Sequence, residues 1–228
     1  MSSDELDRFL ANARGTAATA KIYSLDELRA RRGDLAQTSW GLAALRGRLV
    51  ELSARGASAT LTAAIELVAE AQEQSEPVLW LTLQTGTFYP PDVADSGIDL
   101  AALVVVRCPD ATAAARTAER CLRSGAFGLV ILDLGGHHES SRADGRDLSM
   151  QIQGRLVTLA QTHDAAVVCL TEKTQDTASL GSLVSLRAEA LRRRETPEFA
   201  VELRVLKDKR RGPGFTQSLK RRGPAGLT

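Results

Sequence analysis

The sequence is poor in cysteine and has no long apolar run. Its three cysteines, Cys108, Cys121 and Cys169, show no CxxC spacing, which argues against both a disulfide framework and a zinc site. No stretch of 18 or more apolar residues is present, and the first ten residues lack the basic start and apolar middle of a signal peptide. We therefore expect a cytoplasmic protein that does not associate with membranes.

Aromatic residues are also scarce, at 4% of the chain. Alanine, leucine and valine supply most of the 43% apolar fraction, so the core must consist of aliphatic layers between helices and a sheet. At 228 residues the chain suits one compact domain with some appended sequence.

Charge is nearly balanced overall but unevenly distributed. The formal net charge is +1, yet residues 187–228 contain 12 Lys and Arg against 5 acidic residues. The preceding 186 residues contain 17 basic against 23 acidic residues. The C-terminal end is therefore predicted to be electropositive.

Apolar strand patterns alternate with amphipathic helix patterns between residues 48 and 170. The predicted strands are 48–52, 78–83, 103–107, 128–133 and 165–170, and the predicted helices are 60–74, 111–124 and 147–163. Continuous apolar strands are typical of a parallel sheet with helices on both faces. Two further strands, 183–191 and 199–206, follow, with ETPE at 195–198 as the connecting turn. The fold class is predicted to be α/β.

Three regions are expected along the chain. Residues 1–44 form an N-terminal helical arm and linker, in which Ser2 and Glu5 are spaced as a capping box for a helix over 3–13. Residues 45–209 form the core. Residues 210–228 contain two basic phrases, RRGPG and RRGPAG, with too little apolar surface to pack alone, so we expect disorder there.

The segment 47–63 has the frame of a phosphate-binding loop without its chemistry. In the GxxxxGK[ST] pattern, glycines let the backbone wrap the phosphates, Lys reaches the β and γ oxygens, and the hydroxyl holds Mg²⁺. Ala54, Ala59, Thr60 and Leu61 occupy these four positions. Asp133 ends an apolar strand where a metal-binding carboxylate is expected, but it lacks partner ligands, so we interpret it as a relict. No nucleotide, metal or other cofactor is predicted.

Four segments, in the same order as in the bacterial recombinase RecA, carry a family resemblance. They are GRLVEL at 47–52, RSGA followed by LVILD at 123–133, VSLR at 184–187 and VLKDK at 205–209. The resemblance implies a RecA-like core: a mostly parallel central sheet flanked by helices, with antiparallel strands at the C-terminal edge. The catalytic glutamate of RecA would fall near Gln84, and its polar sensor near Thr171 and Glu172, so the residues needed for hydrolysis are missing.

Within RecA-like proteins, the chain is most similar to the ImuA family, the small accessory proteins of the bacterial mutagenic translesion-synthesis cassette. The similar phrases are LWL at 79–81, GTFYPP at 86–91, SGAFGLV at 124–130 and LKDKRRGPG at 206–214. This resemblance implies a non-catalytic protein that acts in SOS-induced translesion synthesis through protein contacts. The implied partners are ImuB, the error-prone C-family DNA polymerase of the cassette, and RecA, whose filament the protein would modulate or cap.

Two alternatives stay open at this point. One is a cell-division inhibitor similar to SulA, another degenerate RecA-like protein of the damage response. The other is a weak RecA-like ATPase or DNA-binding protein with an unorthodox loop.

Basic residues near the C-terminus are the candidate partner-binding group. Lys207 and Lys209 resemble two lysines that RecA extends across its subunit interface, although solvated charges at an edge strand are the favoured interpretation. Arg210, Arg211, Lys220, Arg221 and Arg222 can neutralise phosphates, but Phe215 is the only aromatic residue beside them. Docking to an acidic protein, with weak or no independent nucleic-acid binding, is therefore our preferred interpretation.

Two adjacent histidines, His137 and His138, precede Glu139 in a polar, glycine-containing loop. Neighbouring histidines do not easily converge on one ion, so a surface loop is predicted here rather than a metal site.

Overall fold

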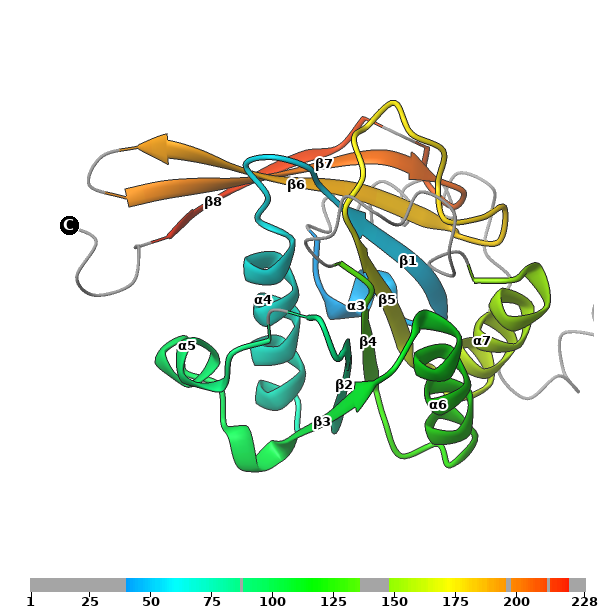
Figure 1. Cartoon of the computed structure of the whole chain (residues 1–228). Coiled ribbons are helices and arrows are strands. Elements are labelled where there is room, and N and C mark those ends of the chain that lie inside the picture. The colour runs from blue at the N-terminus through cyan, green and yellow to red at the C-terminus, as the bar shows by residue number, and fades with distance from the viewer. Residues whose placement is uncertain (1–39, 87, 136–147, 196–197, 213, 222–228) are drawn as a thin grey trace, which may run out of the picture. The chain divides into compact units, whose positions relative to one another are not determined.

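The computed structural model describes residues 40–86, 88–135, 148–195, 198–212 and 214–221. Within these residues, eight strands form one sheet in the order β3-β2-β4-β5-β1-β6-β7-β8 (Figure 1). The strands are β1 (Arg48–Ser53), β2 (Val78–Leu83), β3 (Leu103–Cys108), β4 (Leu129–Asp133), β5 (Ala166–Thr171), β6 (Leu186–Glu195), β7 (Glu198–Asp208) and β8 (Thr216–Arg221). The helices are α3 (Leu42–Leu45), α4 (Thr60–Glu73), α5 (Pro90–Asp95), η1 (Leu100–Ala102), α6 (Ala111–Arg123) and α7 (Met150–Thr162).

Strands β1 to β6 run parallel to one another, and β7 and β8 are antiparallel additions at one edge. This arrangement confirms the predicted α/β class with a mostly parallel sheet. The strands and helices predicted between residues 48 and 170 also form, with bounds that differ by a few residues.

Two aliphatic layers make up the core, one on each face of the sheet. One layer lies under α3, α4 and α5 and includes Trp80, and the other lies under α6 and α7 (Figure 1). The apolar strands β1, β2, β4 and β5 are buried along their whole length, as expected for strands covered on both faces. β3 differs because it is an edge strand, and its Val104 and Val105 are exposed.

Helix ends follow from local sequence. Asp110 caps α6 by accepting a hydrogen bond from Ala113 N–H at 2.7 Å, and Ser149 caps α7 in the same way through Ile152 N–H. At the other end of α6, Gly125 has a φ of +68°, and a Cβ there would lie 2.9 Å from His163 Nδ1. Glycine is thus required where the chain leaves α6 for β4.

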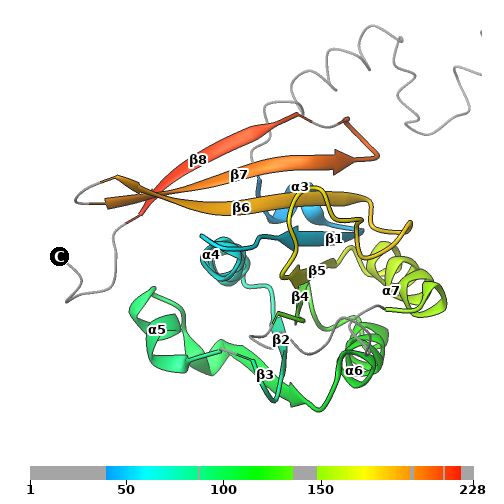
Figure 2. The ribbon, with the colours of Figure 1, turned by 45° about the horizontal axis from the view of Figure 1, so that its top comes forward.

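The C-terminal segment corrects the prediction of disorder after residue 209. Residues 216–221 form β8, whose partners on β7 run from Arg204 to Phe199. Pairing with an existing strand supplies the backbone hydrogen bonds, and Leu219 packs against the core, which the segment's own composition did not reveal. β6, β7 and β8 lie side by side and project past α4 (Figures 1 and 2).

Several predictions fall on residues that are not described. The N-terminal helix over 3–13, most of the arm and linker, the histidine loop and Arg222 lie outside the described residues. Among the described helices, none combines the length and apolar character needed to cross a bilayer. All three cysteines are free, with Cys108 and Cys169 buried.

Candidate functional site

A cleft of about 300 Å³ lies at the carboxyl ends of β1, β4 and β5, beside the first turn of α4. This is where parallel α/β sheets bind ligands. Its lining comes from three segments: the loop and first turn after β1 (Ala54, Gly56, Ser58, Ala59, Thr60, Leu61, Thr62), the end of β4 (Asp133, Gly135) and the end of β5 (Leu170, Thr171, Glu172). The structure therefore brings the degenerate loop and Asp133 together in one cleft.

The backbone of the loop is already hydrogen-bonded within the protein. Ala54 N–H donates to Thr171 O at 3.3 Å, and Ser58 N–H donates to Gly56 O at 2.8 Å. Ala59 N–H donates to Ala190 O at 3.0 Å. A working phosphate loop directs such amides at its ligand. Here these three are used by protein carbonyls.

A short bridge to β6 fixes the loop in this state. Ser58 pairs antiparallel with Leu191, and Arg192 N–H donates to Ala57 O at 2.7 Å. The loop thus continues the sheet as a one-residue extension beside β6. Sequence reasoning missed this bridge, because the loop and β6 are far apart along the chain.

Thr60 and Leu61 stand where a working phosphate loop has its lysine and its metal-binding hydroxyl, and neither side chain can bind phosphate or metal in that way. Thr60 Oγ1 lies 3.1 Å from Ser58 Oγ, so two neutral hydroxyls share a hydrogen bond where a lysine would stand. Leu61 is 37% exposed and offers only carbon atoms where a metal-binding hydroxyl would lie. None of the described residues that line the cleft is a lysine or an arginine, and Arg55 is the only basic residue of the loop.

Asp133 is buried at the end of β4, with 3% of its surface exposed. Burial raises the pKa of Asp133 to about 6, and the hydrogen bond from Thr82 Oγ1 at 3.2 Å offsets only part of that effect. Within the described residues, no group of three or more His, Cys, Asp or Glu can hold a metal ion.

The positions matching RecA's catalytic glutamate and sensor do not form a hydrolytic set. Gln84 is exposed in the turn after β2 and is not among the residues lining the cleft. Thr171 donates its hydroxyl to Glu51 Oε1 at 2.9 Å, and Glu172 is an exposed carboxylate at the rim. Of these three positions, Thr171 and Glu172 line the cleft.

A buried ionic network next to the cleft fixes the segment between β5 and β6. Glu51, fully buried on β1, accepts a hydrogen bond from Leu180 N–H at 2.7 Å and lies 3.4 Å from Lys173 Nζ. Arg187 donates to the carbonyls of Thr174 and Thr177. Neither role was predicted, although a charged residue inside an apolar strand is the sequence signal that could have found Glu51.

Some of the predicted partner-binding residues instead bond to the core. Lys207 is half-buried at the end of β7, and burial, followed by the charge of Lys209, lowers its pKa. Lys209 Nζ donates to Ser182 O, and Arg210 donates to Gly47 O at 3.2 Å. Arg210 thus joins the segment after β7 to the start of β1, and Lys209 joins it to the segment before β6.

Lys220 and Arg221 on β8 lie beside the start of β7, at the opposite end from Lys207 and Lys209. Lys220 is an exposed residue of β8 and pairs with Ala200, while Lys207 pairs with Arg187 of β6. Arg211 is exposed in the turn after β7, and Arg221 pairs with Phe199. The two basic phrases are thus separated by the length of β8, and the described residues among them do not form one patch.

No protein-family model matches the sequence, and no curated protein matches it either. The crystal structure of the RadB recombinase is similar to this structure, with a TM-score of 0.59 and 14% sequence identity. The similarity covers 76% of this chain and 87% of that chain. The chain therefore has a RecA-like fold, in which antiparallel strands extend the C-terminal edge of the sheet. The closer likeness to the ImuA family stays a prediction.

Proposed function

We propose that this chain is a non-catalytic RecA-like accessory protein of SOS-induced mutagenic translesion DNA synthesis. It acts through protein contacts with ImuB and with RecA, and through the assembled complex with the error-prone C-family polymerase. The ImuA-like phrases of the sequence support this role, and the RecA-like fold agrees with it.

The state of the phosphate loop is the main observation in favour of a non-catalytic protein. Its amides at Ala54, Ser58 and Ala59 are bonded to protein carbonyls, and the lysine and metal-binding hydroxyl are replaced by Thr60 and Leu61. Phosphoryl transfer depends on positioning and charge stabilisation, and this loop supplies neither. The protein uses no cofactor in this role.

Capture of partners tests the proposal. The tagged full chain, mixed with separately purified ImuB, RecA and the tubulin-like division protein of the same cell, is expected to retain ImuB and RecA. Capture of the division protein alone would favour the SulA-like alternative and overturn the proposal.

A cellular assay tests the absence of catalysis separately. The Asp133→Asn variant is expected to support damage-induced mutagenesis as well as the unchanged protein, because no metal or nucleotide depends on this carboxylate. Loss of mutagenesis at a normal protein level would show that the cleft has a chemical role.

A further inference from the structure

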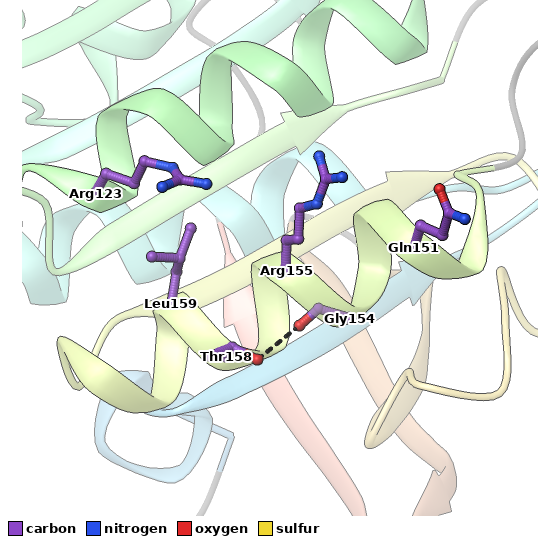
Figure 3. A pocket seen from close by; sticks show the side chains of 6 residues that line it. All are labelled: Arg123, Gln151, Gly154, Arg155, Thr158 and Leu159. Carbon is purple, nitrogen blue, oxygen red and sulfur yellow. Dashed lines mark hydrogen bonds between the residues drawn. The ribbon is translucent and has the colours of Figure 1, made fainter.

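A surface groove of about 540 Å³ runs between α6 and α7, on the opposite face of the sheet from α4. It is lined by Arg123 of α6 and by Gln151, Gly154, Arg155, Thr158 and Leu159 of α7 (Figure 3). Thr158 Oγ1 donates to Gly154 O at 3.0 Å, which satisfies both groups within the helix. The wall of the groove therefore offers few free polar groups other than the two arginines and Gln151.

The two arginines are held by one carboxylate. Arg123 donates to Glu119 Oε1 at 2.6 Å, and Arg155 donates to Glu119 Oε2 at 3.4 Å. The Glu119 side chain is 11% exposed, whereas those of Arg123 and Arg155 are 63% and 57% exposed. Each guanidinium has five N–H donors, so both keep donors that face solvent while their positions are fixed.

The surroundings of the groove are positive. Arg116 and Arg120 on α6 are exposed and make no ion pair with any described residue. On α7, Arg155 is the only charged residue from Met150 to Thr162. Glu119, already engaged, is the only acidic residue on these two helices. The face therefore carries a surplus of arginine.

We propose that the α6–α7 groove docks an acidic segment of a partner protein, with an apolar side chain on Leu159 and carboxylates on Arg123 and Arg155. Arginine forks match carboxylates in a bidentate way, and arginine is enriched among residues that dominate interfaces. A nucleic acid fits less well, because the lining has no aromatic side chain on which a base can stack and its floor is apolar. This inference rests on the proposed function, for which it names a docking surface.

The variant that tests the groove removes its three charges together. Glu119→Gln with Arg123→Gln and Arg155→Gln leaves no buried carboxylate without a counter-charge, so the fold is retained. The matched control is Arg192→Gln, which changes the net charge by the same amount on the exposed part of β6. Thermal melting of both variants verifies folding before binding is measured.

Three fluorescein-labelled probes are titrated into the full chain and followed by anisotropy. They are a peptide of alternating Glu and Leu, a peptide of alternating Lys and Leu, and single-stranded DNA of the same length. We expect the acidic peptide to bind most tightly and to lose about tenfold in affinity with the groove variant but not with the control.

Three results would overturn the inference. Tighter binding of the DNA, lost with the groove variant, would make this face a nucleic-acid surface. Equal binding of the acidic peptide by the groove variant and the unchanged chain would show that the groove is not used. If the groove variant still captures ImuB and RecA, the docking surface is refuted while the proposed function stands.

Discussion

Arg48 and Asp208 form a buried ion pair. Their side chains are 1% and 6% exposed, and Arg48 Nη2 lies 2.6 Å from Asp208 Oδ1. Arg48 also donates to Ser185 Oγ and Ser185 O, so its charge is fully used inside the protein. The pair joins β1 at the centre of the sheet to the end of β7.

The Asp208→Asn variant is expected to lower the free energy of unfolding by about 3 kcal/mol, because Arg48 is left buried without its counter-charge. Urea denaturation at neutral pH measures this loss. The control is Asp164→Asn, since Asp164 is 75% exposed and its oxygen lies 3.8 Å from Arg46. Equal stability of the two variants would contradict the buried-pair explanation.

Replacement of Asp133 is expected to raise the free energy of unfolding, whereas replacement of Asp208 lowers it. Burial raises its pKa from 3.8 to about 6, so the folded state binds the proton more tightly than the unfolded chain does. The free energy of unfolding therefore falls as pH rises from about 4 to about 6, and the cost is fully present above pH 6.

Asp133→Asn removes this cost. We expect the variant to be more stable than the unchanged chain by about 2 kcal/mol at pH 8, and similar to it at pH 4. Thermal and urea unfolding at both pH values provide the measurement. A variant that is less stable at pH 8 would mean that the ionised carboxylate has a partner the structure does not give it.

At the scale of elements, β8 is the strand that depends most clearly on contacts with other segments. It pairs with β7 along Phe199 to Arg204, and Gln217 accepts a hydrogen bond from Trp40 N–H at 2.7 Å. The strand thus closes the edge of β7 and ties the start of the described chain to the sheet.

A chain ended after Arg211 loses β8 and exposes the edge of β7. We expect its melting temperature to fall by about 5 °C or more, with aggregation on heating that light scattering detects. The control is a chain ended after Arg221, which keeps β8. If both shortened chains melt at the same temperature as the full chain, β8 does not contribute to the fold.

The phosphate loop is the second element whose state depends on its neighbours. Because Ala59 N–H and Ala57 O are bonded to β6, side-chain replacement alone does not free the loop backbone. The variant Ala59→Gly, Thr60→Lys, Leu61→Ser rebuilds the GK[ST] motif. We expect its dissociation constant for MgATP in calorimetry to stay weaker than about 1 mM. Micromolar binding by this variant would show that the bridge to β6 opens readily.

At the scale of the whole molecule, apolar periodicity predicted most of the parallel sheet. Strands such as β2 and β4 are continuous apolar runs, and α6 begins directly after Asp110, a capping residue visible in the sequence. The short α5 and β8 were not predicted, because their stability comes from contacts with distant segments. Sequence does not report such contacts.

The candidate site could likewise be predicted from the sequence only in part. The missing lysine and hydroxyl at Thr60 and Leu61 are visible in the sequence, and both positions line the cleft. The hydrogen bonds that engage the loop with β6, and the network around Glu51, join residues more than a hundred positions apart. Arg123 and Arg155 likewise meet only because α6 and α7 are neighbours in the fold.

Charge is also segregated across the sheet. Residues 56–106, which include α4 and α5, contain no Lys, Arg or His, whereas the exposed charges of α6 and α7 are arginines. Helices on opposite faces therefore present opposite charge. Partners of opposite sign are expected to meet different faces, and salt is expected to slow their association.

Calorimetric titration of the full chain with ATP and Mg²⁺ tests whether the phosphate loop binds nucleotide. We expect no saturable heat up to about 1 mM nucleotide, because the amides of Ala54, Ser58 and Ala59 are engaged and no lysine meets the phosphates. Saturable binding with a micromolar dissociation constant, accompanied by phosphate release, would contradict this expectation.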